Sequence, residues 1–342
     1  MFNKSKTIMK HQHLIIIIIF ILSSCKKNDY IKDYLITNRE NVYLTSSILF
    51  STNNNSSYFS DLKIMQKKCI ISDSKSDTIF RIFNNNDFST HCFFTKSDNR
   101  YIINPYNLSF TTEVKNKNND VLFIDGNCRL NSISVKNKKI TNHKMTKPTP
   151  LPYAIDYNIS SKYIYGNQKD SRSMYSFYFY SPDSGLYWIR PANKIKRICN
   201  DPLICSNNLC INEPKNTLVV AYRYVNFISL YNLDGELKTT IQIGEDIAKP
   251  YIHKDLGIKP EKTKKYFIDI YGTSQYIYCL FSGSYDFSTN STVFIFKWNG
   301  IHVKTLQLDH PISKFAIDDK NSFMIGITSN HSGGQDVIRY DL

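Results

Sequence analysis

Residues 227–243 read FISLYNLDGELKTTIQI, two apolar segments separated by a short polar turn. Residues 293–308 repeat the arrangement, with Asn299-Gly300 at the turn. Asp-Gly or Asn-Gly between apolar segments is a strong hairpin signal, because a type I′ turn needs positive φ at both central positions. Each stretch therefore predicts an antiparallel β-hairpin with a type I′ turn.

A second recurring unit consists of a strand, a polar turn and another strand. It occurs three times, and each occurrence has a first and a second predicted strand. The pairs of strands are 153–156 and 163–166, 267–269 and 276–279, and 315–318 and 323–326. Each of the two hairpins lies upstream of one of the last two units. Joined in that order, a hairpin and the unit that follows it predict a four-stranded antiparallel blade. Residues 177–190 look like the hairpin of an earlier blade.

Repetition of small sheets favours a β-propeller, because each sheet has two apolar faces that only neighbouring copies around an axis can cover. At roughly 45 to 53 residues per blade, the chain after Cys25 has room for six blades, or seven. The sequence predicts an all-β propeller of four-stranded antiparallel sheets over 40–342, a single domain. Closure is expected to pair an early segment with the strand 336–342. A β-sandwich joined to a shorter repeat array is the alternative.

No stretch keeps apolar residues at three- and four-residue spacing over several turns, so no helix is predicted. The best candidate, residues 247–256, contains Pro250 and is expected to be a loop. Residues 40–135 fit the repeat poorly, and the first blades are inferred from length alone.

The N-terminus has the pattern of an export signal. Three lysines precede an apolar run over 14–22, which is nine residues long, whereas a membrane-spanning helix needs roughly 20. Leu22-Ser23-Ser24-Cys25 resembles the lipobox of bacterial lipoproteins. We therefore expect a signal peptide over 1–24, acylation of Cys25, and a tether over 25–39. An ordinary signal peptide with an incidental cysteine is the alternative.

Acylation determines the expected location. Two or three acyl chains on Cys25 hold a protein durably at a membrane, whereas one myristoyl chain is marginal. Lys26 and Lys27 follow the cysteine, and no aspartate there indicates inner-membrane retention. The sequence therefore predicts a lipid-anchored cell-envelope protein, at the outer membrane, with the leaflet left open.

Charge does not identify a partner. Without residues 1–24 the chain has 40 basic and 29 acidic side chains, a net charge of +11 (40 − 29), because the removed segment contains three lysines and no acid. The basic residues are scattered in short groups, which favours a solvated surface over a site for anionic glycans, lipopolysaccharide or nucleic acid. An exported location further disfavours nucleic acid.

Seven cysteines remain after Cys25. An odd number cannot all pair, although the envelope permits disulfides. Cys199, Cys205 and Cys210 could supply one disulfide, but their spacing does not fit a zinc site. Buried, unpaired cysteines are favoured.

No catalytic, cofactor or metal residues are predicted, since the chain lacks a GxSxG elbow, an HExxH motif, a phosphate-binding glycine loop and EF-hand spacing. The histidines His253, His302, His310 and His331 are expected to be surface or core residues. Asp125, Asp156, Asp269 and Asp318 recur beside strands, where turn capping is favoured over a calcium or sugar site. The aromatic run is expected to pack between blades rather than stack on sugars. Its members are Tyr175, Phe177, Tyr178, Phe179, Tyr180, Tyr187 and Trp188.

The lipobox, the phrase Tyr-Asn-Leu-Asp-Gly-Glu-Leu over 231–237, and Phe-Ala-Ile-Asp over 315–318 together resemble the TolB-like six-bladed β-propeller lipoproteins of Bacteroides-type bacteria. The resemblance covers residues 150–342 and implies the fold, but no chemistry or ligand. The expected function is a non-catalytic envelope module that binds a glycan, peptide or partner protein. A propeller hydrolase or lactonase with a metal in the central channel is the alternative, and it requires acidic or asparagine side chains that converge on the axis.

Overall fold

The computed structural model describes residues 34–36, 41–53, 57–65, 67–85, 87–96, 103, 108–111, 120–125, 127, 129–143, 158–160, 162–169, 175–181, 185–189, 193–198, 201–254 and 257–342. All of them fall within one compact unit, Asp33–Leu342. The signal peptide, Cys25 and most of the expected tether lie outside the described residues, and so does Asp156.

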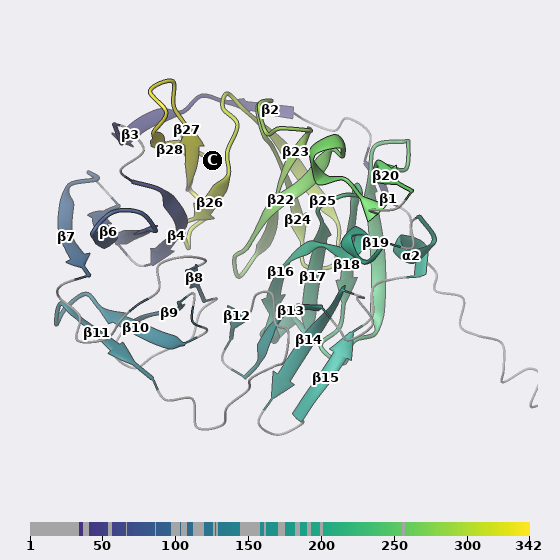
Figure 1. Ribbon diagram of the computed structural model, residues 1–342, viewed down its shortest axis with the longest axis horizontal. Coiled ribbons are helices and arrows are strands. Elements are labelled where there is room, and N and C mark those ends of the chain that lie inside the picture. The colour runs from purple at the N-terminus through teal and green to yellow at the C-terminus, as the bar shows by residue number, and fades with distance from the viewer. Residues whose placement is uncertain are drawn as a thin grey trace, which may run out of the picture. The chain divides into compact units, whose positions relative to one another are not determined.

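Six sheets of four or five strands account for nearly all regular structure in the described ranges, and Figure 1 shows them around a common centre. Blade 1 has β4 (Phe59–Met65), β5 (Lys68–Asp73), β6 (Thr78–Asn84) and β7 (Thr90–Thr95); blade 2 has β8 (Ser109–Phe110), β9 (Val121–Ile124), β10 (Leu130–Ser134) and β11 (Lys139–Asn142); blade 3 has β12 (Asn158–Ile159), β13 (Ile164–Lys169), β14 (Tyr175–Ser181) and β15 (Gly185–Ile189). Blade 4 has β16 (Asn207–Asn212), β17 (Thr217–Tyr222), β18 (Phe227–Tyr231), β19 (Leu237–Ile243) and β1 (Tyr34–Ile36); blade 5 has β22 (Lys265–Gly272), β23 (Tyr276–Ser284), β24 (Thr292–Lys297), β25 (His302–Leu308) and β2 (Asn41–Leu44); blade 6 has β26 (Lys314–Ile317), β27 (Phe323–Ser329), β28 (Gln335–Asp341) and β3 (Ser47–Ser51). A small hairpin of β20 (Ile252–His253) and β21 (Gly257–Ile258) lies between blades 4 and 5 in the chain.

The predicted propeller of antiparallel blades is confirmed, but the predicted grouping of units into blades is wrong. In blade 5 the strand-turn-strand unit, β22 and β23, comes first, and the hairpin of β24 and β25 follows it. In blade 4 the hairpin of β18 and β19 likewise pairs with the preceding β17. The physical reason is the length of the connections, since the short link 223–226 joins β17 to β18, whereas 244–264 separates β19 from β22.

The hairpin turns also differ from the prediction. Both glycines, Gly235 and Gly300, have positive φ, at 85° and 86°, but the residue before each does not. The N–H of Gly235 donates to the carbonyl of Asn232, and the N–H of Gly300 to that of Lys297. A register shift follows in each hairpin. This is a turn with one left-handed glycine and a bulge, which needs positive φ at a single position.

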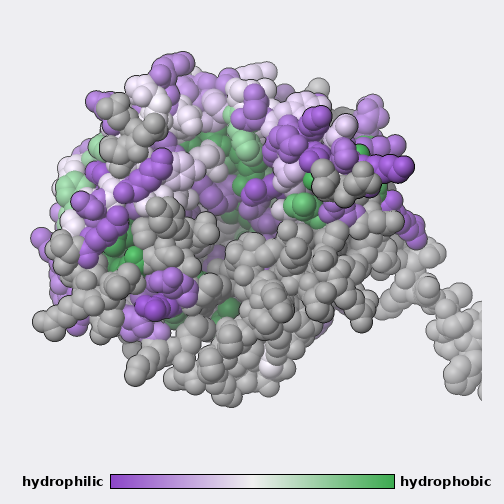
Figure 2. Space-filling model, in the orientation of Figure 1, coloured by the Kyte–Doolittle hydropathy of each residue, from purple (hydrophilic) through white to green (hydrophobic). Residues whose placement is uncertain are grey.

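The hydrophobic core is divided among the contacts between neighbouring blades. All six residues of β17 are buried. Leu218 and Val220 pack with blade 3, whereas Val219 and Ala221 pack with blade 5, as the two-residue period of a strand requires. Across the described residues, each of five apolar clusters combines side chains of two consecutive sheets. Hydrophilic residues cover much of the outer surface that Figure 2 shows. Burial between blades therefore holds the ring together.

The aromatic run in blade 3 follows this rule where the structure describes its side chains. Phe177, Tyr178 and Phe179 are buried, and the Phe177 ring lies 5.6 Å from the Tyr231 ring of blade 4. The expected inter-blade packing is confirmed for Phe177 and Phe179, which belong to the cluster between blades 3 and 4. The side chains of Tyr175, Tyr180, Tyr187 and Trp188 lie outside the described ones.

An early segment closes the ring, as predicted. Strand β3 pairs antiparallel with the C-terminal strand β28. Gln335, at the start of β28, accepts the N–H of Phe59 of blade 1 at 2.5 Å and donates to its carbonyl at 3.4 Å. Blade 6 is thus completed by the N-terminal segment and joined to blade 1.

The N-terminal segment also adds outer strands to the two preceding blades. Strand β1 pairs parallel with β19, and β2 pairs parallel with β25. Strand β1 falls inside the segment that was expected to be tether. Between β2 and β3, the N–H and hydroxyl of Ser46 donate to Asp309 at 2.9 and 3.1 Å, and the Tyr340 hydroxyl donates to the same carboxylate at 2.7 Å. Burial opposes ionisation of Asp309, but bonds from His310, Ser46 and Tyr340 outweigh it and lower its pKa to about 2.

The prediction that the chain has no helix is wrong, because Asn193–Ile198 form the short helix α2. The other helical structure in the described residues consists of three 3₁₀ turns: η1 (Pro202–Cys205), η2 (Glu213–Lys215) and η3 (Pro260–Lys262). Six residues are too few to display helical periodicity. Residues 247–251 form a loop as expected, and β20 follows it. No helix in the described ranges has the length and apolar character needed to span a membrane.

The prediction of buried cysteines is confirmed for Cys69, Cys92, Cys205, Cys210 and Cys279, and no disulfide joins any two of them. Cys128 and Cys199 lie outside the described residues. A disulfide between Cys205 and Cys210 is therefore not formed.

Candidate functional site

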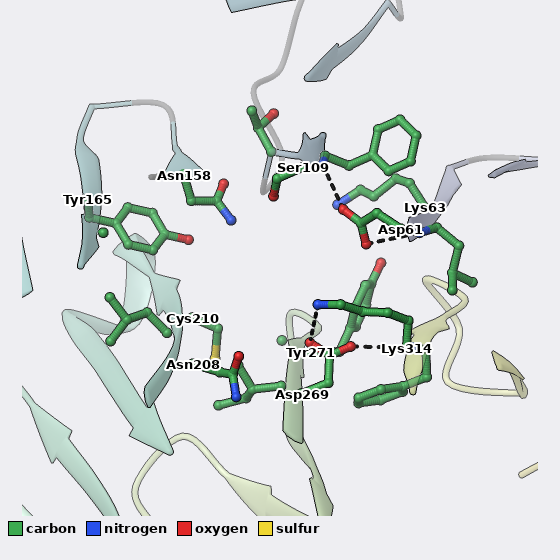
Figure 3. Close-up of a pocket in the computed structure, with 18 of the residues that line it drawn as sticks. Asp61, Lys63, Ser109, Asn158, Tyr165, Asn208, Cys210, Asp269, Tyr271 and Lys314 are labelled. Carbon is green, nitrogen blue, oxygen red and sulfur yellow. Dashed lines mark hydrogen bonds and ion pairs between the residues drawn. The ribbon is translucent and has the colours of Figure 1, made fainter. Parts of the chain in front are cut away.

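A polar pocket of about 180 Å³ lies where the first strands of all six blades meet. Strands β4, β8, β12, β16, β22 and β26 each contribute lining residues, and β13 adds three more. Figure 3 shows charged and amide side chains that point into this space from different blades. The pocket is thus the central channel of the propeller, and no single blade contains it.

The strongest interaction in the pocket is an ion pair between blades 5 and 6. The ammonium of Lys314, at the start of β26, lies 3.1 Å from Oδ1 of Asp269 in β22. The other carboxylate oxygen of Asp269 accepts the N–H of Phe315 at 3.3 Å. Burial acts to lower the pKa of Lys314, but the charges of Asp269 and Asp61 outweigh it and raise that pKa. Lys314 therefore stays protonated between two carboxyl groups.

Asp61 of β4 supplies the second carboxyl group. Its Oδ1 accepts the N–H of Leu62, and its Oδ2 accepts the N–H of Phe110 of blade 2, both at 2.9 Å (Figure 3). Burial raises the pKa of Asp61 to about 6, against the opposing effects of Lys314 and of the bond from Phe110. This carboxyl group therefore titrates closer to neutral pH than an ordinary surface aspartate does.

Irregular pairing directs both carboxylates to the channel. The register of β4 shifts between Phe59 and Asp61, and that of β22 shifts between Phe267 and Asp269. A bulge of this kind inserts a residue into one strand and re-aims the side chains that follow it. The same Phe-x-Asp pattern thus places one carboxylate in the pocket from blade 1 and another from blade 5.

The rest of the lining combines polar and apolar residues. The ammonium of Lys63 lies 5.6 Å from the centre of the Tyr271 ring, and the Asn208 amide donates to the carbonyl of Phe267 at 3.3 Å. Burial, with a contribution from Asp269, raises the pKa of the Cys210 thiol well above its ordinary value. A protonated thiol is a poor nucleophile. The site is therefore equipped to hold a ligand by hydrogen bonds and charge, since ammonium, carboxyl and amide groups face one small space.

Of the three predicted turn-capping aspartates that the structure describes, only Asp269 lines this pocket. Asp318 accepts the N–H groups of Lys320, Ser322 and Phe323 in the turn after β26, and Asp125 accepts those of Asn127 and Arg129 in the turn after β9. Turn capping is confirmed for these two aspartates. It is wrong for Asp269, because the register shift in β22 precedes that residue and directs it to the axis.

The histidines are not brought to the pocket. His302 contacts Thr305, with 2.9 Å between Nε2 and Oγ1, and packs on Phe296. Nδ1 of His310 lies 2.9 Å from Asp309 at the link between blades 5 and 6. These contacts place both side chains in structural roles.

Asp61 and Lys314 were not singled out in the sequence. The sequence does contain a signal for Asp61, because Asp61 and Asp269 both stand in a Phe-x-Asp pattern. Residues 40–135 fit the repeat poorly, however, so the two patterns cannot be aligned from the repeat alone. Lys314 carries no local signal, because its role depends on partners in two other blades.

The lining of the pocket does not match a metal site. Among the described residues, no group of three or more histidine, cysteine, aspartate or glutamate side chains lies close enough to hold a metal ion. Asp61, Asp269, Asn158 and Asn208 do line the channel, but the cation between the two carboxylates is Lys314. The donor set thus fits an internal ammonium better than a divalent metal.

The fold and the axial pocket define the class of protein as a six-bladed β-propeller with a polar central channel. Residues 192–320 match the sequence profile of the TolB-like 6-blade propeller-like family. The match begins just before α2 and ends after β26, so it includes blades 4 and 5 and confirms the predicted family resemblance over that region. No curated protein matches the chain.

Proposed function

We propose that this propeller is a lipid-anchored module of the cell envelope that binds a small polar group in its central channel without transforming it. The observation that carries the proposal is the Asp269–Lys314 pair beside Asp61, at the point where six blades converge. Such a constellation offers donors and acceptors side by side. It suits a group that both donates and accepts, such as a sugar hydroxyl array or the end of a peptide.

The size of the pocket limits the ligand. A volume of about 180 Å³ is below the range of roughly 300 to 1,000 Å³ that is common for drug-sized ligands. A single sugar ring or one peptide terminus is the largest moiety we expect to enter. A larger glycan or protein would place only its end in the channel.

A binding experiment tests the site. The mature protein in detergent should bind members of a panel of monosaccharides and amino acids saturably, as measured by ligand-observed NMR. Lys314→Gln should weaken that binding by about tenfold or more, because it removes a charged donor from the pocket. Lys320→Gln, at an exposed turn of blade 6, is the matched control and should leave affinity unchanged.

Two results would contradict the proposal. One is a folded Lys314→Gln variant that binds as tightly as the wild type. The other is turnover of lactone or glycoside substrates that is lost on chelation, which would favour the metal-dependent hydrolase. Thermal unfolding of the variant separates loss of the site from loss of the fold.

The anchor is a separate part of the proposal and rests on the N-terminal sequence pattern. In cells, Cys25→Ser should move the protein from the membrane fraction to the soluble fraction of detergent-free lysates, because two or three acyl chains are then missing. Cys92→Ser, which alters a buried cysteine of the propeller, should remain with membranes. Continued membrane association of Cys25→Ser would count against acylation at this position.

A further inference from the structure

A second pocket, of about 560 Å³, lies between blades 4 and 5 and shares no lining residue with the central channel. It is formed by the turns that end β16, β22 and β24 and by the start of β19. Lys215, Lys238 and Lys297 line it, and no lining residue is acidic. Three positively charged side chains and no negative one line this hollow, so its charge favours an anion.

One of the three lysines is held in place. The ammonium of Lys238 donates to the carbonyl of Asn216 at 2.6 Å and to the hydroxyl of Thr217 at 3.2 Å. These bonds account for two of its three protons. The fixed ammonium loses little conformational freedom when an anion approaches, which favours binding.

The opposite wall is also rigid. The indole of Trp298 is buried, and its Nε1–H donates to the carbonyl of Thr273 at 2.9 Å. Lys297 and Asn299 flank Trp298 in the turn that Gly300 closes with its N–H bond to Lys297. The side chains that face the pocket from blade 5 therefore project from a fixed frame.

Two acidic residues of the neighbouring turns, Glu213 and Glu236, make hydrogen bonds outside the pocket. Glu213 accepts the N–H of Lys162 of blade 3 at 3.1 Å. Glu236 accepts from the Asn232 amide within its own turn, at 3.3 Å. Neither lines the pocket, so the charge of the three lysines is not balanced by a lining carboxylate.

We propose that the pocket between blades 4 and 5 binds a phosphate group. A doubly charged anion with several oxygens can contact separate ammonium groups at once, and lysine binds phosphate as a point charge. The pocket volume leaves room for the molecule that carries the phosphate. This site is independent of the ligand proposed for the central channel.

The phosphate could belong to a soluble compound or to a lipid headgroup. An acyl anchor on Cys25 would hold the propeller at a membrane, where lipid headgroups carry phosphate. The lipid source therefore rests on the proposed anchor, whereas phosphate binding itself does not.

The test is a titration of the mature protein in detergent with inorganic phosphate, followed by calorimetry. Wild type should bind saturably, and Lys238→Gln/Lys297→Gln should bind about tenfold more weakly or worse, because two charged donors are lost. Lys320→Gln removes one positive charge from a turn of blade 6 and should change the affinity by less than about twofold. Matching unfolding temperatures would show that all variants fold.

Two outcomes would overturn the proposal. The first is that the wild-type protein does not bind phosphate saturably. Equal weakening by Lys320→Gln is the other, because it would reduce the effect to the general positive charge of the protein.

A second arm identifies the source of the phosphate. The Cys25→Ser protein is sedimented with phosphatidylcholine vesicles with and without phosphatidic acid. Binding that requires phosphatidic acid and is lost in Lys238→Gln/Lys297→Gln supports a headgroup. Binding of free phosphate without binding of vesicles supports a soluble phosphorylated compound. Failure of the anchor experiment would leave the phosphate titration unaffected.

Discussion

Replacing Ile338 with alanine is expected to destabilise the protein by about 4 kcal/mol, as measured by urea unfolding, because it leaves a cavity where blade 6 packs on blade 5. Ile338 is fully buried in β28, in the cluster that combines the two blades. The strand also carries the pairing that closes the ring. We expect the urea concentration at the midpoint of unfolding to fall, and the dependence of the unfolding free energy on urea concentration to stay the same.

The cross-strand partner of Ile338 provides the control. Ile48 of β3 lies directly opposite Ile338, yet 61% of its surface is exposed. Ile48→Ala should therefore cost less than about 1 kcal/mol. Equal effects of the two substitutions would mean that apolar packing between blades does not hold the ring.

Asp61→Asn is expected to stabilise the protein at about pH 8 by roughly 2 kcal/mol and to have little effect at about pH 4. The pKa of Asp61 is raised from 3.8 to about 6, chiefly by burial. The folded protein therefore holds this proton more tightly than the unfolded chain. The stabilisation that Asp61 provides is complete below its unfolded pKa and is lost as the pH rises through about 6.

Asparagine removes the cost of the buried charge and keeps an oxygen that can accept the N–H of Phe110. The measurement is urea unfolding of wild type and variant across this pH range. Asp77→Asn is the control, because the Asp77 side chain is 99% exposed and should show no such pH-dependent difference. Stabilisation that is the same at both ends of the range would argue against a raised pKa.

Local sequence predicted the strands well where the repeat is clear. Residues 227–243 became β18 and β19, and 293–308 became most of β24 and β25. Alternating apolar residues and a turn glycine are properties of a short segment, so they can be recognised without the rest of the chain. The turn type was wrong because a bulge beside the glycine removes the need for a second positive φ.

The candidate site was only partly accessible to such reasoning. The sequence identifies Asp269 as one of several aspartates beside strands, a position that predicts a turn cap. The register shift in the pairing of β22 with β23 instead directs Asp269 to the axis. Asp61 and Lys314 meet near Asp269 from blades 1 and 6. No local pattern reports a contact between residues so far apart along the chain.

The sequence by itself determined an all-β chain of repeated small sheets, because the two-residue period of a strand and the chemistry of a turn are local properties. Three features were decided only by the tertiary structure. The first is how those units group into blades, and the second is that the N-terminal segment adds an outer strand to each of blades 4, 5 and 6. The third is that three charged groups meet on the axis. The grouping into blades depends on the lengths of the connections, and the other two features depend on closing the ring, which brings the first and last blades together.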